Sequence, residues 1–450
     1  MTIQSTNRRV ALRAGLASLA APLLPLIPRA HESNRFLPYR GQKIVACWPS
    51  DYFSFQVAKK LLPEFTKKTG IEIEINEIPY IEIKDKLIES GGASAPLYDV
   101  AIYIAPWKSE LVNKKCLTEL TPFLNNKNLA DPQYDFHDLI PGLLINIGLV
   151  GGRMGYLDGP QAKLYGIPRG GETSILAYRK DIFDRYKVKP PSDYKEFASL
   201  LIELHSKSKS PVMTQRLLKG HHCVHSWLLH LNPLGGKIFD TNWNPIFDRS
   251  SGVEAADFLK LVKETGPDGI QEFGFQENIN SFLNGQSSMY LDSTIIASLM
   301  LRPENSDLAK KISFSLHPRG VKYASSSGGF GCGIMANSDK KDASFLFLEW
   351  LTSKKQDIVL TKNGATPNRI STLYQPDLVK ILPGFDVCQK QLLYANPDWR
   401  PLIPEWDALN VNYLGTTIPE ILSGEKSSQS ALTECAKKIK PLMKEWGYYS

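Results

Sequence analysis

In the first quarter of the chain, segments whose hydrophobic residues have the spacing of a β-strand are followed by segments with the spacing of an α-helix. Residues 42–47 (QKIVAC) predict a first strand, and residues 71–78 (IEIEINEI) alternate strictly, which indicates a strand with one buried face. Residues 57–68 carry apolar side chains at helical spacing, and a second helix is expected around 83–89. Residues 98–104 (YDVAIYI) form a continuous apolar run, typical of a strand buried on both faces. This order predicts a mostly parallel sheet with helices packed on it, an α/β fold.

The same order returns further along the chain. Residues 163–178 contain a Gly-rich turn and then an apolar strand, and they precede helical segments at 181–186 and 192–205. Residues 328–335 and 342–352 repeat the order of strand and helix. A chain of 450 residues exceeds what one compact core usually supports, so we expect two lobes or domains.

The first thirty residues differ from the rest. Arg8 and Arg9 form a basic start, and residues 14–27 (AGLASLAAPLLPLI) are apolar and uncharged. This combination predicts an export signal over residues 1–30, because the apolar stretch is shorter than the about 20 residues that span a bilayer. The adjacent arginines resemble the twin-arginine signal. We therefore expect a periplasmic protein, with the twin-arginine (Tat) route as one way to reach the periplasm; a disordered basic tail is the alternative.

Composition places the chain among ordinary soluble globular proteins, with 42% hydrophobic, 22% charged and 10% aromatic residues. The formal net charge is +7, and Arg8, Arg9, Arg13 and Arg29 contribute four of the positive charges. The body of the chain is thus nearly balanced, which argues against nucleic-acid binding. The six cysteines include no C-x-x-C pair. They could form disulfides after export or remain buried thiols.

Motifs for catalysis and metal binding are incomplete. His221, His222 and His225 have the i, i+3 and i, i+4 spacing of zinc or copper ligands on a helix, but the Glu of H-E-x-x-H is absent. The sequence contains no nucleophile elbow, Walker loop or kinase motif set. A glycosidase needs two facing carboxylates, and nothing in the sequence pairs the candidates Asp51, Asp158, Glu172 and Asp292. We therefore expect neither an enzyme nor a cofactor.

Aromatic and polar side chains lie in or beside several predicted strands. Ligands of open parallel sheets bind beyond the carboxyl ends of the strands. Aromatic rings offer flat apolar faces to the C–H faces of a sugar, and charged side chains form strong hydrogen bonds with its hydroxyls. The predicted ligand-binding residues are Trp48, Asp51, Tyr103, Trp107, Arg169, Glu172, Asp292, Phe330 and Trp406. Core packing is the alternative for each aromatic residue taken singly.

Several segments carry a resemblance to a known family. They are residues 98–124 (YDVAIYIAPWKSELVNKKCLTELTPFL), 164–197 (LYGIPRGGETSILAYRKDIFDRYKVKPPSDYKEF), 282–299 (FLNGQSSMYLDSTIIASL) and 328–353 (GGFGCGIMANSDKKDASFLFLEWLTS). Through these segments the chain resembles the bacterial ABC-transporter extracellular solute-binding proteins of family 1, the maltose-binding-protein type. Residues 264–299 are similar to the sorbitol/mannitol-binding branch of that family.

The resemblance implies a two-lobed periplasmic-binding-protein fold, type II-like, with the ligand cleft between the lobes and hinge crossovers. The first lobe is expected at residues 42–173 plus 292–338, and the second at residues 174–291 plus 339–450. The implied protein is a monomer without catalytic activity. It captures a sugar or sugar alcohol and delivers it to the transmembrane subunits of an ABC permease.

The resemblance also suggests roles for individual side chains. Tyr103, Phe330 and Trp406 are expected to stack on or wall the ligand. The charged residues Arg169, Glu172 and Asp292 are expected to bind its hydroxyls.

Two segments depart from the family pattern. The segment HHCVHSWLLH at residues 221–230 is richer in histidine, and residues 148–163 look like a lengthened loop at the rim of the cleft. Two rival functions therefore stay open. One is a secreted carbohydrate-active enzyme, and the other is a metal-capture receptor that uses His221, His222 and His225.

Overall fold

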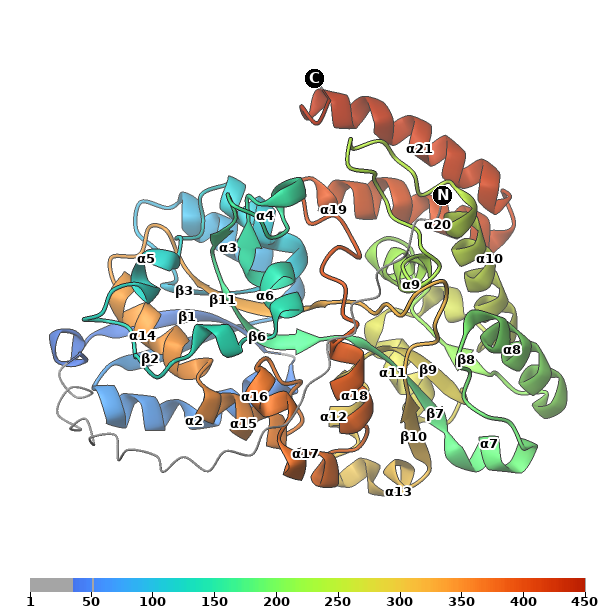
Figure 1. Cartoon of the computed structure of the whole chain (residues 1–450), viewed down its shortest axis with the longest axis horizontal. Helices are drawn as coiled ribbons and strands as arrows, with labels where there is room; N and C mark the ends of the chain where they lie inside the picture. The colour runs from blue at the N-terminus through green and yellow to red at the C-terminus, as the bar shows by residue number, and fades with distance from the viewer. Residues whose placement is uncertain (1–34, 51, 450) are drawn as a thin grey trace, which may run out of the picture.

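The computed structural model describes residues 35–50 and 52–449. The predicted export signal and Asp51 lie outside the described residues. Figure 1 shows two groups of helices and strands side by side along the long axis of the molecule, each built around a β-sheet. We call the group that contains β1 lobe 1 and the group that contains β7 lobe 2. The predicted α/β class with two lobes is thereby confirmed.

Lobe 1 is built on a five-stranded sheet. Its strands, in order across the sheet, are β2 (Glu72–Ile78), β1 (Lys43–Pro49), β3 (Val100–Ile104), β11 (Gly328–Ile334) and β6 (Ile167–Glu172). β1 runs parallel to β2 and β3, as predicted, but β11 is antiparallel to β3 and β6. The sheet is therefore mixed, and the expectation of a mostly parallel sheet needs correction. The helices of this lobe are α2 (Phe53–Thr69), α3 (Tyr80–Gly92), α4 (Lys108–Asn113), α5 (Thr121–Leu124), α6 (Pro141–Gly148), α14 (Lys341–Leu351) and α15 (Lys354–Lys362).

The sequence of helix α2 determines which of its faces is buried in lobe 1 and where the helix ends. Phe55, Leu62 and Phe65 recur at helical spacing and are buried in the core of lobe 1. Gly70 ends the helix with a φ of 75°, a left-handed conformation that glycine adopts without a steric penalty. The chain can therefore turn directly into β2, which pairs with β1 along its whole length.

Lobe 2 is built on a four-stranded sheet with the order β10 (Ile312–Ser315), β7 (Ser174–Arg179), β9 (Met289–Ser293) and β8 (Met213–Thr214). Its longer helices are α8 (Tyr194–Ser208), α9 (His221–Leu231), α10 (Ser250–Thr265), α11 (Phe275–Leu283), α20 (Gly415–Ser423) and α21 (Ser428–Glu445). Figure 1 shows α21 on the outside of this lobe, beside α10 and α20. The shorter helices of this lobe are α7 (Lys180–Tyr186), α12 (Ile295–Leu299), α13 (Ser306–Ala309), α18 (Phe385–Leu392) and α19 (Trp406–Ala408). Between the lobes, α16 (Ile370–Leu373) and α17 (Pro376–Ile381) both contact α15 of lobe 1, and α17 also contacts α18.

Neighbouring chain segments connect the two sheets. One is the link at Thr173 between β6 and β7, and another leads from β10 to β11. The Thr173 Oγ1 atom lies 2.9 Å from Ser325 Oγ and 2.8 Å from the carbonyl oxygen of Ser326. The two crossings are thus held together by side-chain hydrogen bonds at the junction of the lobes.

The predicted lobe boundaries need correction at two places. Asp292 was expected to begin the returning part of lobe 1, but it lies in β9, which pairs with β7 and β8 in lobe 2, and β10 pairs with β7 as well. Residues from 339 onward were expected in lobe 2, but Phe345 and Leu348 of α14 are buried in the core of lobe 1. The order of strands and helices cannot reveal these placements, because it does not say which sheet an element joins.

Candidate ligand-binding site

Arg216 and Asp292 form a buried ion pair in lobe 2. Arg216 follows the short strand β8, and Asp292 lies in the adjacent strand β9. Arg216 Nε donates to Asp292 Oδ2 at 2.6 Å, and Arg216 Nη2 donates to Asp292 Oδ1 at 2.5 Å, the bidentate geometry that suits a guanidinium and a carboxylate. Burial alone would raise the pKa of Asp292, but Arg216 outweighs it and holds this pKa well below its usual range. Asp292 is therefore ionised and neutralised by a protein side chain.

Further donors surround the same carboxylate. The backbone N–H of Ser293 donates to Asp292 Oδ1 at 2.7 Å, and Asn278 Nδ2 donates to Oδ2 at 3.3 Å. His225 Nε2 lies 3.4 Å from Asp292 Oδ1 and 2.9 Å from Arg216 Nη2. Because both oxygens of Asp292 already accept hydrogen bonds from the protein, the carboxylate acts mainly to hold Arg216 in place.

Glu172 lies at the end of β6, where the chain leaves lobe 1. Ser293 Oγ of lobe 2 donates to Glu172 Oε2 at 2.7 Å, so the two lobes meet at this carboxylate. Burial raises the pKa of Glu172, although Ser293 and Arg216 act in the opposite direction. The charge of Arg400 also acts on Glu172, and burial lowers the pKa of the Arg400 guanidinium. Two guanidinium groups and two carboxylates thus share one partly enclosed cluster.

Aromatic rings extend from lobe 1 to lobe 2 beside these charges. The Tyr52 ring, just before α2, lies edge-on to Phe330 of β11 with ring centroids 4.6 Å apart. On the other side it lies nearly parallel to Phe275 of α11, with centroids 6.5 Å apart. The Arg216 guanidinium carbon lies 4.9 Å from the centroid of Phe275, a cation–π contact. Flat apolar surfaces and charged hydrogen-bonding groups therefore meet at the junction.

Trp399 and Arg400 approach the cluster on the segment that leads to α19. Trp399 Nε1 donates to the carbonyl oxygen of Ser327 at 2.6 Å, beside the crossing into β11. Its ring is perpendicular to His225 at a centroid distance of 5.4 Å, and the Arg400 guanidinium carbon lies 4.4 Å from its centroid. Trp399 therefore orients a histidine and an arginine of the cluster.

The histidine-rich segment forms the start of α9. Burial lowers the pKa values of His221, His222 and His225, to about 4 for the last two, so these rings are neutral. His225 already contacts Arg216, and His221 Nδ1 lies 2.9 Å from Asn410 Nδ2. Among residues 35–50 and 52–449, no group of three or more His, Cys, Asp or Glu side chains is arranged to hold a metal ion. The metal-capture alternative receives no support from these positions.

Three aromatic residues that sequence reasoning placed in the site are buried in lobe 1. Trp48 Nε1 donates to the carbonyl oxygen of Phe55 at 3.2 Å, and the Tyr103 hydroxyl donates to that of Ile147 at 3.1 Å. Trp107 packs in the same hydrophobic cluster as Tyr103. Their position near strand ends suggested a ligand contact, but contacts within the core account for all three.

Arg169 and Trp406 are likewise almost completely buried, with exposed fractions of 2% and 1%. Arg169 Nη2 donates to the carbonyl oxygen of Ser54 at 2.9 Å, and its guanidinium carbon lies 4.7 Å from the Phe55 ring centroid. Trp406 belongs to the hydrophobic core that extends through lobe 2. Sequence position alone could not distinguish such buried side chains from ligand-binding ones.

Glu172, Asp292 and Phe330 are the predicted residues that the structure brings together at the junction of the lobes. Arg216 and Arg400 were missed. Arg216 follows a strand of only two residues, too short to produce a recognisable pattern. The Trp–Arg dipeptide at positions 399–400 was a usable signal, because an aromatic ring next to a guanidinium commonly marks a binding surface.

The open space at this junction is small. A pocket of about 30 Å³ is lined by residues of both lobes, among them Tyr52, Glu172, Ile295 and Phe330. Sites for small molecules usually measure about 300–1,000 Å³. The lobes are therefore in close contact in this conformation, and this pocket leaves no room for a ligand of several heavy atoms.

The fold and the site together define a two-lobed binding protein whose polar cluster lies between the lobes. The model of the bacterial extracellular solute-binding protein family matches residues 54–358, and the chain belongs to that family. The resemblance inferred from the sequence is thereby confirmed. The chain is a solute-binding protein, and its family consists of binding proteins that act outside the cytoplasm.

Individual relatives cover most of the chain. A probable amino-acid ABC transporter periplasmic-binding protein of Sinorhizobium fredii is 26% identical, over 98% of this chain and 99% of the relative. A mannitol-binding protein of Pseudomonas aeruginosa is also 26% identical, over 70% of this chain and 75% of the relative. The crystal structure of an ABC transporter solute-binding protein from Agrobacterium radiobacter in complex with ribitol has a TM-score of 0.78 and 25% identity, covering 90% of this chain and 99% of that one.

The part of the chain that the structure describes contains no helix that is both long and apolar enough to cross a membrane. All six cysteines lie in this part, and each is buried and unpaired. Burial raises the pKa of several of these thiols, to about 12 for Cys47, Cys223, Cys332 and Cys388. The cysteines therefore behave as packed, unreactive side chains.

Proposed function

We propose that the protein captures a neutral sugar alcohol or sugar in the periplasm and delivers it to the transmembrane subunits of an ABC permease. The observation that carries this proposal is the internal charge balance of the cluster. Arg216 is neutralised by Asp292, and Arg400 lies in the field of Glu172. A neutral ligand leaves this balance intact, whereas a ligand with a net charge would bury a charge without a partner, which is costly.

The side chains at the junction also suit a polyhydroxylated ligand. The free oxygen of Glu172 can accept hydrogen bonds from hydroxyls, and the remaining N–H groups of Arg216 and Arg400 can donate to them. The rings of Tyr52 and Phe275 offer apolar faces to C–H groups of the ligand. The mannitol-binding relative and the ribitol complex support a sugar alcohol.

Binding on this proposal is coupled to closure of the lobes. Tyr52 and Glu172 belong to lobe 1, and Phe275 and Ser293 to lobe 2, so a ligand between them contacts both. Such contacts favour the closed state, since only a difference in affinity between two states shifts their equilibrium. The crossings near Thr173 and Ser325 would bend as the hinge. The permease would then recognise the closed form.

The remaining features of the proposal come from the sequence and the family. Residues 1–30 would direct export, by the twin-arginine route in view of Arg8 and Arg9. The protein would act as a monomer that binds its ligand without changing it chemically.

A thermal-shift screen tests the ligand class. Mannitol, sorbitol, ribitol, erythritol, glucose and a set of amino acids are added separately to the purified protein. A ligand that binds only the folded state raises the melting temperature by mass action. We expect an increase with at least one sugar alcohol or sugar, and calorimetry then gives its affinity. If no carbohydrate or polyol changes the melting temperature, the proposed ligand class is wrong.

An amino acid is the second candidate. It is favoured by the relative described as an amino-acid-binding protein and by the presence of Arg400 and Glu172, which could bind a carboxylate and an ammonium group. The same screen separates the candidates, because only an amino-acid receptor responds to amino acids. Calorimetry with an amino acid and with its amide adds a second criterion, since the amide lacks the carboxylate that Arg400 would bind.

A further inference from the structure

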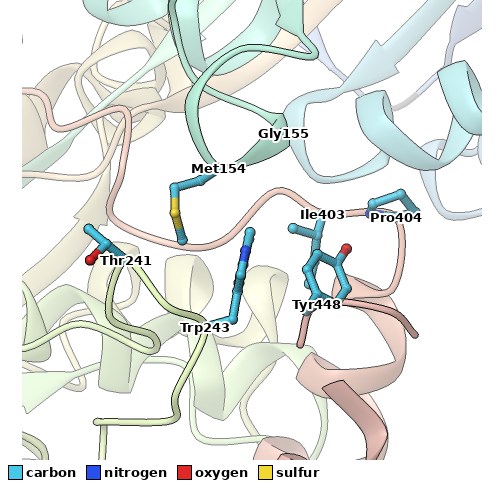
Figure 2. Close-up of a pocket in the computed structure, with 7 residues that line it drawn as sticks. All are labelled: Met154, Gly155, Thr241, Trp243, Ile403, Pro404 and Tyr448. Carbon is cyan, nitrogen blue, oxygen red and sulfur yellow. The ribbon is translucent and has the colours of Figure 1, made fainter. Parts of the chain in front are cut away.

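A second and much larger pocket lies away from the charged cluster. Its volume is about 400 Å³, within the range of small-molecule sites. Figure 2 shows the side chains that surround it, which include Met154, Thr241, Trp243, Ile403 and Tyr448. None of the residues of the charged cluster lines it. The site between the lobes therefore does not explain this pocket.

The lining of this pocket is aromatic and apolar. The ring centroids of Trp243 and Tyr448 lie 4.5 Å apart, and Figure 2 shows the Met154 side chain between Thr241 and Trp243. The Tyr448 hydroxyl donates to Glu405 Oε2 at 2.7 Å. The lining residues include no Asp, Glu, Lys or Arg, so the pocket offers no charge to an ionic ligand. Thr241 contributes a hydroxyl that can bind a polar group.

Two of these residues have an unusual backbone conformation. Met154 has a φ of 53° and Trp243 a φ of 63°, in the left-handed region that residues other than glycine rarely adopt. Neither residue ends an α-helix, unlike Lys187 and Lys209, which have similar φ values at helix C-termini. Such strain persists only where surrounding contacts maintain it, and it is concentrated at functional sites.

Specific contacts hold the pocket walls. The Tyr449 hydroxyl donates to the carbonyl oxygen of Trp243 at 2.7 Å. The buried Lys108 donates to the carbonyl oxygen of Tyr156 at 2.8 Å, next to the turn that contains Met154. The Tyr156 hydroxyl in turn donates to Asp398 Oδ1 at 2.6 Å. The loop over residues 148–163, which the sequence marked as lengthened, is thereby fastened against the rest of the protein and forms one wall of the pocket.

We propose that this pocket is a second small-molecule site, which binds a neutral pyranose ring. The absence of charged side chains from its lining excludes recognition of an ionic ligand, and the Trp243 and Tyr448 rings can cover the C–H face of a sugar. The Thr241 hydroxyl can bind a hydroxyl of the sugar. This inference goes beyond the proposed function, because it does not depend on which ligand occupies the charged cluster.

Ligand-observed saturation-transfer NMR with methyl β-D-glucopyranoside tests the site in the full chain. The sugar alcohol found in the screen is present at saturation, so that the charged cluster is occupied and does not contribute to the transfer. The variant Thr241→Trp fills the pocket from an exposed loop position, and Asn242→Trp adds the same bulk at the neighbouring exposed residue, which does not line the pocket. We expect transfer to the sugar with the unaltered protein and Asn242→Trp, and at least a tenfold weaker signal with Thr241→Trp. Absence of transfer with the unaltered protein, or equal transfer with Thr241→Trp, would overturn the proposal.

A second pair of variants separates this pocket from the charged cluster. Glu172→Gln alters the cluster and should leave transfer to the glucoside unchanged, whereas Trp243→Ala should abolish it. Trp243→Phe retains a ring and should retain at least part of the signal. Melting curves show whether each variant is folded, and a folded Trp243→Ala protein with full transfer contradicts the proposal. Loss of transfer in Glu172→Gln alone would place the glucoside in the charged cluster and equally contradict it.

Discussion

Arg216 Nη2 and Nε donate to the two carboxylate oxygens of Asp292 at 2.5 and 2.6 Å, in a part of lobe 2 where Asp292 has no exposed surface. Removing one partner would leave the other as a buried charge without compensation. We therefore expect Asp292→Ala and Arg216→Met each to lower the free energy of unfolding by about 3–5 kcal/mol. Urea denaturation followed by circular dichroism measures this loss.

The double variant Arg216→Met/Asp292→Leu provides the control for this first prediction. It removes both charges and fills the space with apolar side chains, so its loss of stability should be smaller than that of either single variant. If the losses of the two single variants simply add, Arg216 and Asp292 do not act as a pair.

Glu172 contributes to ligand affinity more than to stability. Burial raises its pKa, so the fold gains little from its ionised form, while its carboxylate can accept charged hydrogen bonds from ligand hydroxyls. We expect Glu172→Gln to weaken binding of the sugar alcohol found in the screen by about tenfold or more, with the melting temperature of the ligand-free protein unchanged or higher. Isothermal titration calorimetry measures the affinity. Glu277→Gln serves as the control, since that carboxylate accepts from the Gly274 N–H; an equal loss in both variants would contradict the assignment.

The sequence predicted the architecture well because the relevant signals are local. The strict alternation of residues 71–78 became β2, and the apolar run of residues 98–104 contains β3. Both patterns indicate which faces of a strand are buried, because successive side chains of a strand point to opposite faces. A short run of sequence is therefore enough to make this prediction. Which sheet a strand joins is a non-local property. Asp292 was therefore assigned to the wrong lobe, although residues 282–299 around it were recognised as similar to a segment of the family.

The site was predicted only in part for a related reason. Trp48 and Tyr103 are aromatic residues near strand ends, as ligand-binding aromatics often are, but they are buried in lobe 1. Residue type and position near a strand end do not reveal whether a side chain is buried in the core or faces a ligand. Arg216 lies 76 residues before Asp292, and only the sheet brings the two together. The charge balance of the cluster depends on such pairs, so it could not be inferred before the structure.

Buried histidines should make the protein sensitive to acid. Burial lowers the pKa values of His222 and His225 to about 4 and that of His317 to about 3, against about 6.5 in an unfolded chain. Between these values the unfolded state binds more protons than the folded state, so stability falls as the pH decreases from about 6.5 toward 4. Each histidine contributes a slope of up to about 1.4 kcal/mol per pH unit. Glu172, whose pKa is raised, acts in the opposite direction and reduces the net slope.

The variant His317→Gln isolates one of these contributions. His317 Nδ1 lies 3.0 Å from Ser174 Oγ and Nε2 lies 3.1 Å from the Tyr194 hydroxyl, and a glutamine amide can replace part of this bonding without titrating. We expect the dependence of unfolding free energy on pH to become flatter between pH 6.5 and 4 in this variant. The control His137→Gln changes an exposed histidine and should keep the original slope. Urea denaturation at several pH values distinguishes the two, and equal slopes in both variants would exclude His317 as a contributor.

An ion pair near the lobe junction should stabilise the closed conformation modestly. Lys84 of α3 in lobe 1 binds the carboxylate of Asp407 in α19 and lies 3.4 Å from Glu110 Oε2. The side chains of Lys84 and Asp407 are 21% and 36% exposed, so solvent screens the pair and we expect a contribution of only about 0.5 kcal/mol. Lys84→Met keeps the apolar stem of the side chain and removes the charge. If the pair forms only in the closed state, this variant should bind the ligand about twofold to threefold more weakly, and the difference should shrink at high ionic strength.

Lys86→Met is a matched control on the same helix, because Lys86 pairs with Glu89 within α3 and cannot bridge to α19. Calorimetry at low and high salt measures the effect, and equal affinities of the Lys84 and Lys86 variants would show that the Lys84–Asp407 pair does not contribute to closure.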